Sequence, residues 1–113
     1  MITELKENQC FVFGSNLEGN HVGGAAKQAY EDFGAIWGIG VGRQGQSYAI
    51  PTMPPLSLTE IRMYISQFIE YAELNPAIEF LVTPIGTGIA GYSLEQMDEI
   101  WNKYNLPANI KLL

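Results

Sequence analysis

The stretch that decides the fold is residues 78–101, IEFLVTPIGTGIAGYSLEQMDEIW. Its first part, Ile78–Pro84, is a short apolar run that predicts a strand, apolar enough to lie centrally in a sheet. A glycine-rich loop over Gly86–Gly91 follows. Ser93-Leu94-Glu95-Gln96 then matches a capping box, in which the first and fourth side chains satisfy free N–H groups of a helix's first turn. The apolar positions of the expected helix recur at helical spacing: Leu94, Met97, Ile100, Trp101 and Tyr104.

A similar unit begins near the N-terminus. Cys10–Phe13 is a β-type apolar run, and Gly14-Ser15-Asn16 ends it. The first glycine-rich loop of the chain, residues 14–24, leads to a helix that is expected to begin near Gly24 or Ala25, with Gly34 as its C-cap. The loop over Gly86–Gly91 is the second. The core face of that helix is predicted from its spacing: Ala26, Ala29, Tyr30 and Phe33.

The remaining segments complete an alternating pattern. Ile36–Val41 and Ser47–Ile50 are predicted to be two strands joined by a tight turn over 42–45. Arg43 and Gln44, at this turn, either contact the ligand or form an exposed hairpin tip. Ser57-Leu58-Thr59-Glu60 is a further capping box, and it opens a helix that Asn75-Pro76 ends. A last strand is expected over Asn109–Leu113. The order is β-α-β-β-α-β-α-β, which favours an α/β fold: a three-layer α/β/α sandwich around a mixed, mainly parallel sheet.

Composition limits the class of protein. The 113 residues are 47% apolar and 16% charged, which suits one globular domain over residues 1–113. With 12 acidic and 6 basic residues the net charge is −6, which weighs against non-specific binding to nucleic acid or to an anionic membrane. No run approaches the ~18 apolar residues of a membrane helix, and the first residues lack the apolar core of a signal peptide.

The single cysteine, Cys10, points to a reducing compartment. One cysteine supports neither a disulfide framework nor a zinc cluster, so we expect a cytoplasmic protein with no metal and no cofactor. Cys10 itself is expected to be a buried, inert thiol, because nothing cationic or basic adjoins it in the sequence.

Both glycine-rich loops follow a strand and precede a helix, the place where open α/β sheets bind ligands. Backbone N–H groups that converge at such a helix N-terminus bind phosphate without any cationic side chain. An acidic chain can therefore still bind a small anionic ligand.

These residues carry a resemblance to a known family. Residues 11–16 (FVFGSN) followed by 23–26 (GGAA) resemble the first loop of macro domains, and residues 83–92 (TPIGTGIAGY) resemble their second phosphate loop. Residues 48–52 (YAIPT) resemble the strand between them. The chain also resembles a group of small bacterial and phage proteins with a Gly-Ser-Asn-Leu-x-Gly-x-His start to the first loop, here Gly14 to His21.

The resemblance implies binding of ADP-ribose or a related NAD-derived nucleotide. By position, Asn16 would contact the distal ribose, and the amides of residues 23–25 would contact one phosphate. Residues 86–91 would wrap the diphosphate from the other side, and Tyr92 would shape that loop. The implied ligand-binding set is Gly14, Ser15, Asn16, Gly23, Gly24, Ala25, Gly86, Thr87, Gly88, Ile89, Ala90, Gly91 and Tyr92.

Two further functions stay open at this stage. The first is hydrolysis of ADP-ribosylated macromolecules or ADP-ribose derivatives, with Asn16 and His21 as catalytic candidates and Glu18 assisting. His21 is the only histidine, and its polar neighbours predict that it lies exposed or near the ligand. The alternative is a loop histidine that only makes a local hydrogen bond. The second is a non-catalytic interaction or assembly protein, and an oligomer is compatible with the sequence. Thr87 either donates its hydroxyl to a phosphate or stabilises its own loop.

Overall fold

The chain alternates strands and helices in the order that its sequence predicts. The computed structural model describes residues 2–113. Its elements are β1 (Gln9–Ser15), α1 (Gly24–Asp32), β2 (Gly42–Gln44), β3 (Ser47–Pro51), α2 (Leu58–Leu74), β4 (Glu79–Val82), α3 (Leu94–Trp101) and β5 (Ile110–Leu112). They form an α/β fold in which three helices pack around a mixed five-stranded sheet.

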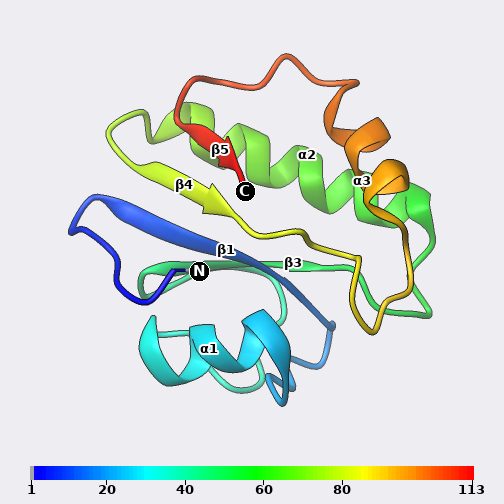
Figure 1. Ribbon diagram of the computed structural model, residues 1–113, viewed down its shortest axis with the longest axis horizontal. Coiled ribbons are helices and arrows are strands. Elements are labelled where there is room, and N and C mark those ends of the chain that lie inside the picture. The colour runs from blue at the N-terminus through cyan, green and yellow to red at the C-terminus, as the bar shows by residue number, and fades with distance from the viewer. Residues whose placement is uncertain (1) are drawn as a thin grey trace.

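The sheet has the strand order β2-β3-β1-β4-β5, so β1 is its central strand. Strand β1 pairs in parallel with both β3 and β4, and β4 pairs in parallel with β5. Only the short β2 is antiparallel, forming a hairpin with β3. The carboxyl ends of the parallel strands therefore share one edge of the sheet, on the right in Figure 1.

The two faces of the sheet bury different helices. Along β1, Phe11 and Phe13 join the hydrophobic cluster of α1. Cys10 and Val12 alternate with them and join the larger cluster of α2 and α3, as the period of two in a strand requires. Figure 1 shows α1 on one side of the sheet and α2 with α3 on the other.

Cys10 is fully buried in the larger cluster, as predicted. Burial raises the pKa of its thiol to about 12, only partly opposed by the charge of Arg43. The thiol is therefore protonated and unreactive at neutral pH. None of the helices formed by residues 2–113 is both long and apolar enough to cross a membrane.

The capping signals in the sequence are confirmed. Ser57 and Glu60 form both hydrogen bonds of a capping box at the start of α2, and Ser93 and Gln96 do the same for α3. Gly34 follows α1 with a φ of +79°, a left-handed conformation that glycine adopts at low cost. Helix α1 begins differently, because its N-cap is Gly23 and no side chain caps it.

One predicted strand is wrong. Ile36–Val41 is an irregular loop, and the hairpin begins only at Gly42. Gly38 has a φ of +92°, outside the range of a strand. Gly40 packs so closely on the first glycine-rich loop that a Cβ there would overlap the carbonyl oxygen of Asn16. Contacts distant in sequence therefore override the apolar pattern of this segment.

Three side chains lie elsewhere than predicted. Tyr30 and Leu94 were expected in the core, but they are 45% and 59% exposed. Gln44 was expected at an exposed tip, but it is buried. Its side chain accepts a hydrogen bond from the Ile36 N–H at 2.6 Å. The tight turn of the hairpin is formed by Gly45 and Gln46, at the end of the predicted range 42–45.

Candidate functional site

The ends of three strands meet where the sequence placed the ligand. A Cβ on Gly14, near the end of β1, would lie 3.5 Å from the backbone nitrogen of Gly86 and 3.1 Å from the hydroxyl oxygen of Thr52. Gly86 belongs to the loop after β4, and Thr52 follows β3. The two glycine-rich segments therefore lie against each other at the carboxyl edge of the sheet, and a side chain at position 14 would be tight only against the Thr52 hydroxyl.

The first loop uses its polar side chains to hold its own shape. The Asn16 side chain accepts a hydrogen bond from the Asn20 N–H at 2.8 Å and donates one to the Asn20 carbonyl at 3.1 Å. The Ser15 hydroxyl is buried and donates to the carbonyl of Gly40. Two side chains of the predicted ligand set therefore fix the loop that leads to α1.

The N-terminal end of α1 is open. Gly23 and Gly24 have no neighbour within 4 Å of the position that a Cβ would occupy. The first turn contains no acidic residue, and no side chain caps it. The first N–H groups of a helix have no partner within the helix, and the helix dipole favours an anion beside them. Ala25, the third residue of this predicted group, is partly buried against the α1 cluster.

The second loop is closed by bonds of its own. The Tyr92 N–H donates to the Gly86 carbonyl at 2.9 Å, and the Gly91 N–H donates to the Gly88 carbonyl at 3.0 Å. The Thr87 hydroxyl donates to the Pro84 carbonyl at 2.7 Å, so it stabilises its own loop. The aromatic side chain of Tyr92 is partly buried against the α2–α3 cluster and anchors the loop there.

This closure leaves the middle of the second loop facing outward. Ile89 is 85% exposed, and a Cβ on Gly88 would meet nothing within 4 Å. Within the described part of the chain, no protein acceptor receives a hydrogen bond from the N–H groups of residues 86–90. Gly86 is itself buried, and a Cβ on it would overlap the Met97 side chain. The amides of residues 87–90 are therefore the donors available to solvent or to a ligand. Ala90 lies among them, partly buried.

His21 lies in the interior, so the prediction of an exposed histidine is wrong. Its side chain is 1% exposed, and Nε2 lies 2.9 Å from the carbonyl oxygen of Ile36. The ring packs edge-on against Phe13 at a centroid distance of 5.4 Å. The physical reason is the 36–41 loop, which takes the place of a predicted strand and supplies the carbonyl that His21 contacts. Glu18, its predicted assistant, is exposed in the same loop.

One residue at this edge was not anticipated. Thr52 is 2% exposed, and its hydroxyl oxygen lies beside Gly14, where the three segments meet. Its backbone N–H donates to the Ser15 carbonyl at 3.0 Å, which ties the ends of β1 and β3 together. The only sequence signal was its position directly after an apolar run, and many threonines share that feature.

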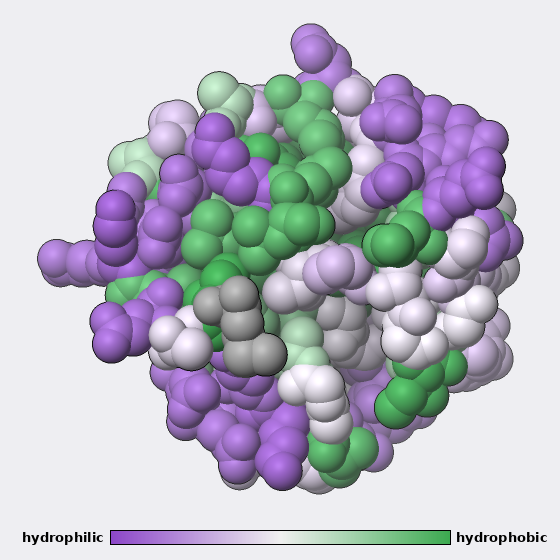
Figure 2. Space-filling view, in the orientation of Figure 1, coloured by the Kyte–Doolittle hydropathy of each residue, from purple (hydrophilic) through white to green (hydrophobic). Residues whose placement is uncertain are grey.

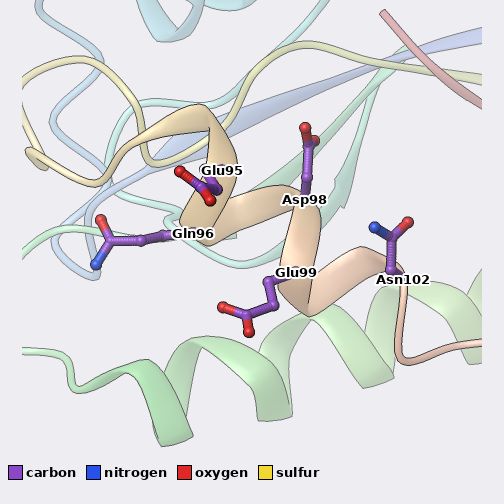
Figure 3. A pocket seen from close by; sticks show the side chains of 5 residues that line it. All are labelled: Glu95, Gln96, Asp98, Glu99 and Asn102. Carbon is purple, nitrogen blue, oxygen red and sulfur yellow. The ribbon is translucent and has the colours of Figure 1, made fainter.

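Two hollows of the described surface lie beside α3. One, of about 520 Å³, is lined by polar and acidic side chains along that helix: Glu95, Gln96, Asp98, Glu99 and Asn102 (Figure 3). Its three carboxylates would repel an anion. The other, of about 30 Å³, lies between α3, the end of β4 and the C-terminal residues, where hydrophobic side chains gather over β5 (Figure 2). Neither hollow is lined by the first glycine-rich loop.

Among residues 2–113, no three or more histidine, cysteine or acidic side chains are grouped so that they could hold a metal ion.

Comparisons with family models, with curated proteins and with solved structures find no match for this chain.

Proposed function

We propose that this chain binds ADP-ribose or a related NAD-derived nucleotide, with the diphosphate held by backbone amides of the two glycine-rich loops. The amides at the start of α1 would contact one phosphate, and those of residues 87–90 would contact the other. The observation that carries the proposal is the close approach of Gly14 and Gly86, which brings the roots of both loops together. Both loops also present open glycines, Gly24 and Gly88.

The charge of the protein agrees with this mode of binding. With a net charge of −6, the chain offers no basic cluster to phosphate. Peptide N–H groups at a helix N-terminus and in a glycine-rich turn bind anions through partial charges that do not depend on lysine or arginine. The absence of an acidic residue in the first turn of α1 keeps that end attractive to an anion.

The geometry favours binding over hydrolysis. A general base must reach the proton that it removes, within hydrogen-bond distance or through one water. His21 is buried and bound to a backbone carbonyl, and the Asn16 amide is engaged with Asn20. We therefore assign neither residue a catalytic role and propose a binding module as the primary function.

We also propose that the fold is a three-layer sandwich of macro-domain type and that the protein is cytoplasmic. A three-layer α/β/α sandwich of macro-domain type is supported by the separate packing of α1 and of α2 with α3 on opposite faces of the sheet. A cytoplasmic location is supported by the single buried thiol of Cys10, which suits a reducing compartment.

Isothermal titration calorimetry with ADP-ribose, NAD, AMP and cyclic ADP-ribose tests the proposal. We expect ADP-ribose to bind and the Gly88→Glu variant to lose that binding, because the new carboxylate would project among the donor amides. The fold should survive, since a side chain at Gly88 meets open space, and circular dichroism checks this. Wild-type protein that gives no heat with millimolar ADP-ribose would overturn the proposal.

Gly88→Gln is the matched control for this variant. Glutamine has nearly the same size as glutamate but no charge. We expect it to weaken binding less than glutamate does, because only the carboxylate repels the diphosphate. Equal losses in the two variants would mean that bulk alone blocks the site. Unchanged binding in Gly88→Glu would exclude the second loop from the site.

A further inference from the structure

An exposed aromatic pair lies beside the first loop. Tyr30, on α1, and Trp37, in the 36–41 loop, are 45% and 48% exposed. Their ring centroids are 5.5 Å apart, with an interplanar angle of 70°. Val22 and Ile36 are also exposed, by 69% and 49%. Large aromatic surfaces are normally buried, so a half-open tyrosine and tryptophan in contact mark a candidate binding surface.

This pair is close to the end of α1 that we assign to a phosphate. Side chains on a helix lean toward its N-terminus. The Tyr30 ring accordingly lies 6.3 Å from the ring of His21, which precedes the N-cap Gly23 by two residues. With a rise of 1.5 Å per residue, the backbone of Tyr30 is about 9 Å along the helix from Gly24. The sugar of a nucleotide can bridge that separation.

His21 supplies a second, independent observation. Its Nε2 faces a carbonyl oxygen and must therefore carry the proton of that hydrogen bond. In the neutral ring, Nδ1 is then an acceptor, and it is buried without any partner. Buried polar atoms are normally paired, and an unpaired one needs an explanation. The Trp37 ring, like that of Tyr30, lies 6.3 Å from the His21 ring.

We propose that Tyr30 and Trp37 form the subsite for the planar ring of the bound nucleotide, with Nδ1 of His21 as an acceptor for an N–H group of that ring. This inference rests on the proposed function, because the phosphates at α1 would bring the ring to this surface. The ring would stack on the open aromatic faces, an interaction available to any base. Because Nδ1 is buried, contact with it requires a neighbouring side chain to move.

Tryptophan fluorescence reports directly on this subsite. The chain has two tryptophans, and Trp101 is buried in the cluster on the opposite face of the sheet. In a Trp101→Phe background, Trp37 is the only tryptophan emitter. We expect ADP-ribose to quench its emission saturably. Inorganic pyrophosphate should bind by calorimetry with little change in emission. AMP and nicotinamide mononucleotide show which ring the subsite accepts.

A substitution separates the ring from the phosphates. Trp37→Leu should raise the Kd for ADP-ribose roughly 5- to 150-fold, the range expected for one base–aromatic stack. It should leave the Kd for pyrophosphate unchanged. Leu74→Ala is the matched control: it removes an exposed apolar side chain at the end of α2, on the opposite face of the sheet, and should change neither value.

The outcomes distinguish the two proposals. If ADP-ribose quenches Trp37 but pyrophosphate does not bind, the ring subsite stands and the amide site fails. If pyrophosphate binds and Trp37→Leu leaves ADP-ribose affinity unchanged, the ring subsite fails alone. Equal loss of both ligands would also overturn it. So would a wild-type dimer in light scattering that Trp37→Leu converts to a monomer, because a second copy would then cover the aromatic pair. Absence of all binding overturns both proposals.

Discussion

The two glycine-rich loops after β1 and β4 look alike in the sequence, but different contacts stabilise them. The first is held from outside, because the 36–41 loop packs on it and the Ser15 hydroxyl bonds to Gly40. It leads into a helix whose N-terminus has no side-chain cap. The second loop is stabilised by hydrogen bonds within it, which the Tyr92 and Gly91 N–H groups donate. It leads into α3, whose first N–H groups are bonded by a capping box.

This difference shows where free donors remain. After the first loop, the free N–H donors lie at the start of α1, because the loop's polar side chains bond elsewhere and none caps this helix. In the second they lie within the loop, since Ser93 and Gln96 already satisfy the start of α3. A glycine-rich loop is thus an ambiguous signal until it is known which amides its own side chains satisfy.

The largest expected difference between the two connections concerns stability. Gly40→Ala should lower the free energy of unfolding by about 3 kcal/mol, because the new methyl group overlaps the Asn16 carbonyl and neither backbone can move freely. Gly88→Ala should stay within about 0.5 kcal/mol of wild type, since that position is open. Denaturant unfolding measures both. Similar values for the two variants would contradict the distinction between a packed and an open loop.

A smaller effect is expected at the start of α3. Ser93→Ala removes the acceptor of the Gln96 N–H and should lower stability by about 1 kcal/mol. It should leave ADP-ribose affinity unchanged, because the donors of the second loop lie before this helix. Ser66→Ala, at an exposed position within α2, is the control for loss of a serine hydroxyl. A large loss of affinity in Ser93→Ala would place the start of α3 in the site.

The smallest stability change is expected at the start of α1. Gly23→Asp supplies a capping carboxylate at an extended N-cap and should raise stability by about 0.5 kcal/mol. The same carboxylate should abolish nucleotide binding, since it would occupy the place of the phosphate. Gly23→Asn gives a cap without charge and should weaken binding less. A variant that is both more stable and fully able to bind ADP-ribose would show that the start of α1 does not contact the ligand.

Local signals in the sequence were sufficient for most of the fold. Each capping box lies within four consecutive residues, so Ser57 and Ser93 mark their helices without any knowledge of the rest of the chain. The 36–41 loop was mispredicted as a strand because its conformation depends on distant partners. The Gly38 N–H donates to the Gly19 carbonyl, and Gly40 fits against Asn16. No apolar pattern encodes such contacts.

The candidate site was predictable to the same extent. Glycines between a strand and a helix indicated the carboxyl edge of the sheet, and Gly14 does adjoin Gly86 there. Side-chain roles were not predictable, because they depend on what packs over each residue. His21 was expected at the surface and is buried by the 36–41 loop, whereas Tyr30 was expected in the core and is half exposed.

The most direct test of the shared amide site is a titration of ¹⁵N-labelled protein with ADP-ribose, followed by two-dimensional ¹H–¹⁵N NMR. The account predicts that the amide signals of Gly24 and Ala25 shift together with those of Gly88 and Ile89, all with one Kd. Shifts confined to a single loop, or no shift in either, would contradict it.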